Sequence, residues 1–276
     1  MRGWWSCDEM NNNLFAATII NVNGDDKLIF HFLNIEDYNE PFKELIDKYI
    51  VSIYDNTFNN EEMQLVKEQL KEWFKEKKSD ENKKSGFVAE FICHLYINQL
   101  NYEQHFLFKN LEEQGSMKKG FDGLYKMNDE MWLYESKSSL STTSSANHNS
   151  NISDAYNDMK AKLKGTKTNK NGNPISPWDN AVNHAIVASV DNNKTLIQNL
   201  KKFRERFIKK DFENIKNFNL IPSSTMFLEE NWENIDSADL ENKLKKLTSK
   251  YEYNQMNIIC INKKSIDSFI RYISGI

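Results

Sequence analysis

The sequence contains few of the residues that mark disulfide-rich or zinc-binding scaffolds. Cysteine occurs only three times in 276 residues, as Cys7, Cys93 and Cys260, and no two cysteines lie near each other in the chain. A disulfide framework or a structural zinc site needs several cysteines at short spacings such as CxxC. The sequence therefore excludes both, and it favours a reducing compartment, which we expect to be the cytoplasm.

Long hydrophobic runs are also missing. The longest apolar run covers residues 14–20, whereas a membrane-spanning helix needs about 20 apolar residues. Asp8 and Glu9 would interrupt the apolar segment of a signal peptide. We therefore expect a protein that does not enter the membrane.

Positive charge is not in excess, because 36 Lys and Arg face 40 Asp and Glu, for a net charge of −4. Nucleic-acid-binding surfaces normally show clustered Lys and Arg, so any such surface must be local. What the sequence does contain is 39% apolar and 12% aromatic residues, enough to form a sizeable core. No internal repeat of solenoid or propeller length is present.

Hydrophobic patterning predicts strands that alternate with helices. The first elements are strands at 15–22 and 27–32 and helices at 40–49 and 61–77. Residues 75–84 are almost all polar and are interpreted as an exposed boundary, which divides the chain into an N-terminal α+β region (1–80) and a second domain (81–276). The second domain is predicted to contain helices at 86–100, 152–164, 196–210, 238–250 and 265–273, strands near 106–108, 185–190 and 256–261, and a hairpin at 120–137. This order is typical of an α/β sheet covered by helices.

The hairpin carries the most informative residues. Asn128-Asp129 suits a two-residue turn, and this turn places Asp122 directly opposite Glu135. Opposed side chains on one face of an antiparallel pair have Cβ atoms about 5 Å apart, close enough for two carboxylates to share one hard cation. Lys137 lies two residues beyond Glu135 and therefore projects from the same face.

A solvated hairpin face is the alternative interpretation, because exposed hairpins often carry acids and lysines. The neighbouring residues favour a functional site, since apolar residues occupy both faces of the hairpin. Leu124, Met131 and Leu133 are predicted to share the face of Asp122 and Glu135, and the opposite face is predicted to carry Phe121, Tyr125, Trp132 and Tyr134. Paired acids at the edge of buried surface need a metal ion or a basic partner.

The helix before the hairpin offers a third acid. Ser85 is predicted to cap a helix that is apolar almost all round except for a stripe of Glu90, His94 and Asn98. Gly86 would let this helix approach its neighbours closely. Glu90 is a candidate ligand, whereas His94 is interpreted as a hydrogen-bonded polar residue; alternatively, the whole stripe faces solvent.

A helix with Glu90, a strand with Asp122 and a following strand with Glu135 and Lys137 together resemble the PD-(D/E)xK, or restriction-endonuclease-like, nuclease superfamily. The helix-strand-strand order of residues 85–137 is similar to the core of that superfamily, although Phe121 stands where its motif has proline. The resemblance implies a restriction-endonuclease-like mixed β-sheet flanked by helices, here with an N-terminal α+β extension.

Three segments resemble one family more closely: Gly86-x-x-x-Glu90, Gly120-Phe-Asp-Gly and Trp132-Leu-Tyr-Glu-Ser-Lys. They look like the HamA nuclease subunit of the Hachiman anti-phage defence system. This resemblance implies a Mg²⁺-dependent DNA nuclease in bacterial defence that works beside a helicase partner.

Carboxylate ligands select Mg²⁺, or Mn²⁺, over softer metals. The resemblance implies that Asp122 and Glu135 hold the cation, with Glu90 and the carbonyl group of Ser136 as further ligands. The bound cation would activate water and polarise the scissile phosphate. Lys137 would orient that water or neutralise developing charge, so the expected catalytic residues are Asp122, Glu135 and Lys137.

Local lysine-rich segments are the candidates for DNA binding. The candidate residues are Lys160, Lys164, Lys167, Lys201, Lys202 and Arg204. Each segment is alternatively an ordinary solvated helix face. The acidic residues 229–241 would repel DNA and are predicted to face a protein partner.

Two further functions remain open from the residues alone. One is a catalytically inactive module that kept the nuclease fold and binds nucleic acid or a partner, and the other is a structural adaptor. The Ser/Thr-rich segment 138–150 has no Gly-x-Ser-x-Gly pattern, so it is interpreted as a flexible loop beside the site.

Overall fold

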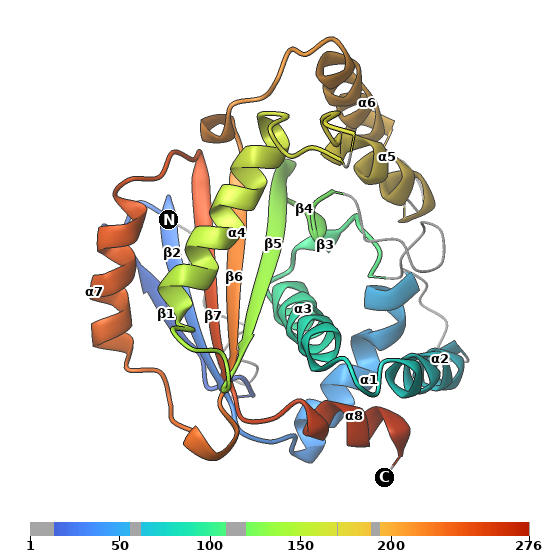
Figure 1. Cartoon of the computed structure of the whole chain (residues 1–276), viewed down its shortest axis with the longest axis vertical. Coiled ribbons are helices and arrows are strands. Elements are labelled where there is room, and N and C mark those ends of the chain that lie inside the picture. Colours follow the sequence, from blue (N-terminus) through green and yellow to red (C-terminus); the bar gives the residue numbers. More distant parts are fainter. Residues whose placement is uncertain (1–13, 56–61, 109–119, 170, 189–193, 276) are drawn as a thin grey trace.

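A computed structural model describes residues 14–55, 62–108, 120–169, 171–188 and 194–275. Cys7 therefore lies outside the described residues. The described chain forms one seven-stranded sheet in the order β1-β2-β7-β6-β5-β4-β3 (Figure 1). The strands are β1 (Thr18–Asn21), β2 (Leu28–Ile35), β3 (Glu103–Gln104), β4 (Gly123–Met127), β5 (Glu130–Leu140), β6 (Asn219–Phe227) and β7 (Gln255–Lys263).

The sheet is mixed, as predicted. Its four central strands, β2, β7, β6 and β5, run parallel to one another, whereas the edge strands β1, β4 and β3 pair antiparallel. The predicted N-terminal strand pair therefore forms, and β2 pairs with β7 from Leu28↔Met256 to Ile35↔Lys263. The boundary at residue 80 stays a prediction, but the region before it contributes two strands to the same sheet as the hairpin.

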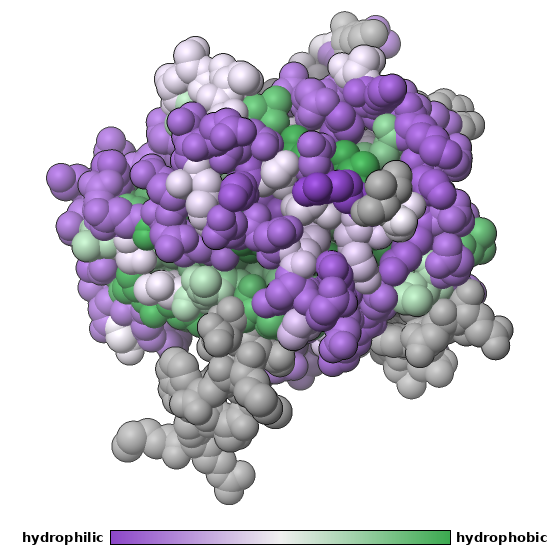
Figure 2. Space-filling view, turned by 90° about the horizontal axis from the view of Figure 1, so that it is seen from below, coloured by the Kyte–Doolittle hydropathy of each residue, from purple (hydrophilic) through white to green (hydrophobic). Residues whose placement is uncertain are grey.

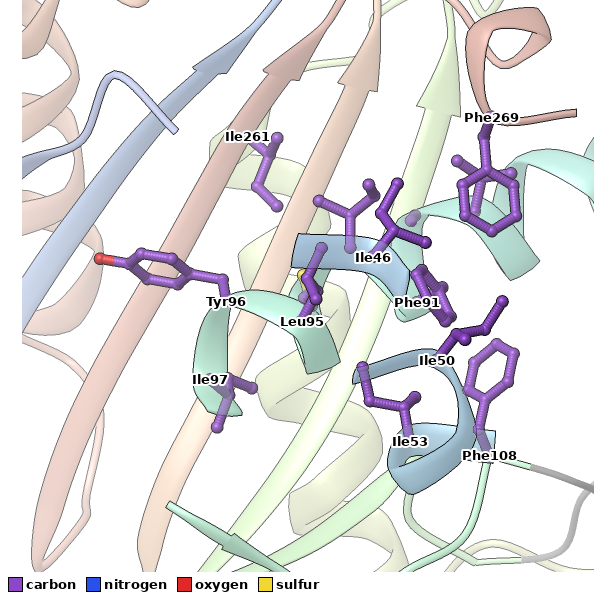
Figure 3. Packing of buried hydrophobic residues seen from close by; sticks show 14 of the residues in the cluster. Ile46, Ile50, Ile53, Phe91, Leu95, Tyr96, Ile97, Phe108, Ile261 and Phe269 are labelled. Carbon is purple, nitrogen blue, oxygen red and sulfur yellow. The ribbon is translucent and has the colours of Figure 1, made fainter. Parts of the chain in front are cut away.

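Helices cover both faces of this sheet. One hydrophobic cluster joins the sheet to α1 (Glu40–Asp55), α2 (Met63–Glu76), α3 (Glu81–Gln99) and α8 (Asp267–Ser274). Figure 3 shows this packing, in which Phe91 of α3 lies near Ile50 of α1 and Phe269 of α8. The opposite cluster contains residues of α4 (His148–Leu163), α5 (Pro177–Ala188), α6 (Lys194–Ile208) and α7 (Ser237–Thr248).

The surface is largely polar. Figure 2 shows hydrophilic side chains over most of the lower face of the molecule, with smaller hydrophobic areas between them. No helix in the described ranges has the length and apolar character needed to cross a membrane.

The polar segment 75–84 is only partly a loop, because α2 ends at Glu76, residues 77–79 form a turn, and residues 81–84 belong to α3. The helix α3 begins at Glu81, and the side chain of Asp80 caps it by accepting a hydrogen bond from the Lys83 amide (3.0 Å). Ser85 is therefore not the N-cap; its hydroxyl group donates to the Asn82 carbonyl (3.0 Å) within the first turns. Alternating Glu and Lys have good helix propensity, and Asp80 is an equally suitable capping residue.

Two strands were placed wrongly by sequence patterning. Residues 177–188 form helix α5, so the strand predicted at 185–190 is wrong over 185–188, and 189–190 lie outside the described residues. The strand β3 lies at Glu103–Gln104 instead of 106–108. The central strand β6 was missed, although every residue in it is buried. Its Pro222 and consecutive serines are unusual in a central strand. The β6–β7 ladder skips Pro222 between Leu220↔Met256 and Ser223↔Ile259, which accommodates a residue without an N–H group.

Two glycines have roles different from those expected. A Cβ atom at Gly86 would meet nothing within 4 Å, so Gly86 does not create a close helix approach. At Gly123 a Cβ atom would lie 2.9 Å from Tyr134 Cδ1 and 3.2 Å from His94 Cε1. The close contact between α3 and the hairpin therefore depends on Gly123.

Replacement of these two glycines by alanine should have opposite effects. Gly123→Ala should lower the free energy of unfolding by about 1–3 kcal/mol, because the added methyl group overpacks against His94 and Tyr134. Gly86→Ala should raise it by about 0.5–1 kcal/mol, because alanine has the higher helix propensity. Urea unfolding of both variants measures these changes. Equal destabilisation by the two substitutions would contradict the assigned packing.

Candidate active site

The hairpin has the predicted register. Gly123 pairs with Tyr134 and Leu124 with Leu133, and the turn residues Asn128 and Asp129 have φ values of 49° and 63°. Both φ values lie in the left-handed region that a type I′ turn requires. Asp122 immediately precedes β4, and its amide group donates a hydrogen bond to the Tyr134 carbonyl (3.1 Å).

Glu135 is the buried acid of the site. It lies on β5 and is only 2% exposed.

The two faces of the hairpin pack in different hydrophobic clusters. Leu124 and Leu133 belong to the cluster that contains α4, whereas Tyr125, Trp132 and Tyr134 belong to the cluster that contains α3, as the alternation of side chains along the strands predicted. Phe121 is the exception, because it packs in the α4 cluster against Trp178, with ring centroids 5.5 Å apart.

Asp122 is held beside Glu135 by the backbone of β5. Its Oδ2 atom accepts a hydrogen bond from the Ser136 amide at 2.8 Å. Ser136 lies between Glu135 and Lys137, whose side chains share a face of the strand. The contact therefore holds the Asp122 carboxylate next to these two residues. The predicted proximity of these three residues is therefore present, while the ligand role of the Ser136 carbonyl stays a prediction.

Lys137 lies between two carboxylates. Its Nζ atom is 3.1 Å from Glu135 Oε1 and 2.7 Å from Asp158 Oδ2. Burial lowers the pKa of Lys137, but the charge of Glu135, the hydrogen bond to Asp158 and the charge of Asp122 outweigh burial and raise this pKa above its ordinary value. Lys137 therefore stays protonated at neutral pH.

Helix α4 supplies two site residues, Asp158 and Lys162, that sequence reasoning did not assign to the site. Lys162 Nζ lies 2.6 Å from Glu135 Oε2, so each oxygen of the buried carboxylate has a lysine partner. Asp158 bridges Lys137 and Lys167, whose Nζ atom is 2.8 Å from Asp158 Oδ1. The sequence did contain a signal for these two residues. Asp158 lies three positions after the buried Ala155, and Lys162 lies three positions after the buried Met159, so both lie on the flank of the same helix face.

The pKa of Asp158 is lowered to about 2. Burial raises it, but hydrogen bonds from Lys137 and Lys167 and the charges of both lysines outweigh burial. Asp158 is therefore a fixed anion at neutral pH.

Glu90 lies on α3, whose buried apolar residues belong to the cluster on the opposite face of the sheet, and its Oε1 atom is 3.6 Å from His94 Nε2. The pKa values of Tyr125 and Tyr134 on that face are raised, first by burial and also by the negative charge of Glu90. His94 is fully buried and its Nδ1 atom is hydrogen-bonded to the Tyr125 hydroxyl, so it is a hydrogen-bonded polar residue as predicted, while Glu90 and Asn98 of the same stripe are half-buried.

Across the described residues, no group of three or more His, Cys, Asp or Glu side chains is arranged to hold a metal ion. Glu90 is thus not brought together with Asp122 and Glu135 as a ligand set. Asp122 and Glu135 alone do fit a hard cation in kind, because Mg²⁺ is commonly held by one or two carboxylates, retains several waters and also binds substrate phosphates. The ammonium groups on buried Glu135 show that this position requires positive charge.

The lysines predicted to bind DNA divide into paired and exposed ones. Lys167 is paired with Asp158, Lys160 lies 3.8 Å from Glu252, and Arg204 lies 4.0 Å from Asp179. The exposed residues outside these ion pairs are Lys164, Lys201 and Lys202. The carboxyl end of α4 and helices α5 and α6 lie at the same end of the molecule (Figure 1).

The fold and this hairpin define a protein of the α/β nuclease-like class: a mixed seven-stranded sheet with helices on both faces. The family model for HamA matches residues 8–274, nearly the whole chain. The chain therefore belongs to the HamA family and is a component of Hachiman anti-phage defence, as the resemblance implied. None of the curated proteins compared with the chain matches it.

Asp158 should contribute to stability in a pH-dependent way. Its pKa in the folded protein, about 2, is below the ordinary value of 3.8, so its contribution is present above about pH 4 and disappears as the pH falls toward 2. Asp158→Asn should therefore lower the free energy of unfolding at pH 7, by about 1 kcal/mol after solvent screening. It should also make the decline in stability below pH 4 shallower.

Urea unfolding at pH 7, 4 and 3 tests this expectation. Asp154→Asn is the matched control, because Asp154 is exposed on the same helix. If the D158N and D154N proteins show the same pH dependence, Asp158 does not stabilise the site in the way described.

Proposed function

We propose that the protein is a Mg²⁺-dependent DNA nuclease, with Mn²⁺ as an alternative cation, acting in anti-phage defence. One observation carries the proposal: Glu135 is almost fully buried, yet it lies beside a second carboxylate, Asp122, and a protonated lysine, Lys137. Two adjacent carboxylates in a poorly hydrated position repel each other, and a hard cation held by both would offset this repulsion.

Each residue has a distinct role in the proposed reaction. Asp122 and Glu135 hold the divalent cation, which supplies Lewis-acid activation of water and of the scissile phosphate when bound. Lys137 stabilises the negative charge that develops on the phosphate, because its raised pKa keeps it protonated. Asp158 positions Lys137 by accepting its second hydrogen bond.

Control by a protein partner follows from the biology of such an activity. A nuclease that cleaved DNA without restraint would damage its host, and the HamA resemblance implies a helicase as the restraining partner. The acidic residues 229–241 support a protein contact, since they would repel DNA. These residues include the amino-terminal half of α7, whose first turn is capped by Asp236.

Removal of the charged group of Glu135 or of Lys137 on β5 should strongly reduce cleavage. Glu135→Gln and Lys137→Met should each reduce Mg²⁺-dependent cleavage of DNA by about 100-fold or more, because each removes charge that acts on the reacting phosphate. The measurement is DNA cleavage by the full chain, alone and with its protein partner, with circular dichroism to verify folding. Lys126→Met is the matched control, because Lys126 lies on the same hairpin but pairs with exposed Asp129. Undiminished cleavage by both site variants would refute the proposal.

A catalytically inactive nucleic-acid- or partner-binding module is the second candidate. The observation in its favour is that Glu90 does not join the two carboxylates in the described site. Two measurements distinguish this module from a nuclease. An inactive module would bind DNA equally well in the presence of EDTA, and it would not cleave DNA either with or without its protein partner.

The exposed lysines of α6 should contribute to DNA binding through phosphate contacts. The double variant Lys201→Ala/Lys202→Ala should weaken DNA binding and reduce the slope of log K against log salt concentration by about 2, because each phosphate contact releases counterions. Fluorescence anisotropy in increasing salt measures this slope. Lys243→Ala on α7, where the lysine is paired with Asp239, should leave it unchanged. An unchanged slope in the double variant would mean that α6 does not bind phosphates.

A further inference from the structure

Lys162 is placed differently from a surface lysine. Its Nζ atom lies 2.6 Å from Glu135 Oε2, and its side chain is only 12% exposed. The ammonium group also lies 5.9 Å from the centre of the ring of Phe121, the buried residue that precedes Asp122. Lys162 is thus fixed at the oxygen of Glu135 that Lys137 does not contact.

The site around it is electrically balanced. Three carboxylates, Asp122, Glu135 and Asp158, are accompanied by the ammonium groups of Lys137, Lys162 and Lys167. A divalent cation bound to Glu135 would therefore add charge to a group that is already neutral. Coulomb repulsion in this poorly hydrated position favours the departure of one ammonium group.

Lys162 is the ammonium group that can depart most easily. Lys137 is shared by Glu135 and Asp158, so its movement would break two ion pairs, whereas the ion pairs of the described residues give Lys162 only Glu135. Its four-carbon stem is flexible and can carry the ammonium group toward solvent.

We propose that Lys162 is a built-in counter-ion, which occupies the place of a divalent cation on Glu135 and leaves this carboxylate when the metal ion binds. The inference rests on the proposed function, because it assumes that Asp122 and Glu135 are metal ligands. Its consequence is that Lys162 sets the metal concentration at which the site is filled.

Binding of Mn²⁺ to the full-length protein tests this role without measuring cleavage. Electron paramagnetic resonance of free Mn²⁺ gives the dissociation constant. Lys162→Met should tighten binding by about ten-fold, because it removes the competing charge. Lys162→Arg, which keeps the charge and fits a carboxylate better, should not tighten binding.

Two controls separate this effect from general electrostatics. Lys160→Met removes a lysine of the same helix that contacts Glu252 instead of Glu135, and it should leave the affinity unchanged. In a Glu135→Gln background, Lys162→Met should have no effect, because the shared carboxylate is absent.

The outcomes distinguish the two proposals. If the original protein binds Mn²⁺ through Glu135 but Lys162→Met leaves the affinity unchanged or weaker, only the counter-ion role is overturned. If Glu135→Gln leaves Mn²⁺ binding unchanged, or none is detected, the metal site of the proposed function and the counter-ion role both fail.

A measurement on the unmodified protein covers the case in which Lys162→Met does not fold. Competitive acetylation followed by mass spectrometry should show Lys162 reacting faster in the presence of Mn²⁺, because its amine leaves the carboxylate. An unchanged rate would overturn the proposal.

Discussion

The buried carboxyl group of Glu135 is the constraint on which the site depends. A carboxylate that is 2% exposed loses most of its hydration, and an unpaired charge there would cost several kcal/mol. The chain meets this cost with Lys137 from the same strand and Lys162 from α4. Because Lys162 must reach Glu135, the position of α4 on the sheet is tied to the chemistry of the site.

A second buried lysine, Lys263, responds to burial differently from Lys137. Lys263 at the end of β7 is fully buried, and its contacts are the Ser268 hydroxyl (2.8 Å) and the face of Tyr38 (4.3 Å). Burial lowers its pKa to about 7, with Asp37 and Glu229 opposing the shift. Lys263 thus approaches neutrality, whereas Lys137 beside its carboxylates stays protonated. In this fold, a buried lysine therefore stays charged when it forms close ion pairs.

The sequence predicted the parts of the site that depend on neighbours in the chain. The turn at Asn128-Asp129 fixed the hairpin register, and the register placed Asp122, Glu135 and Lys137 together. It did not predict Asp158 and Lys162, because their partners on β5, Lys137 and Glu135, lie more than 20 residues away and the contacts depend on how α4 packs. For the same reason β6 was missed: its serines and Pro222 are tolerated only because neighbouring strands and helices bury them.

The position of the site follows from the difference in length between β4 and β5. The β4–β5 pairing ends at Gly123↔Tyr134, whereas β5 continues beside β6 to Leu140. Beyond Tyr134 the edge of β5 needs a hydrogen-bond acceptor that β4 no longer supplies, and the Asp122 side chain accepts from the Ser136 amide at 2.8 Å. The same contact that satisfies the backbone brings a second carboxylate next to Glu135. The end of the hairpin therefore creates a paired-acid site as a direct result of completing the sheet.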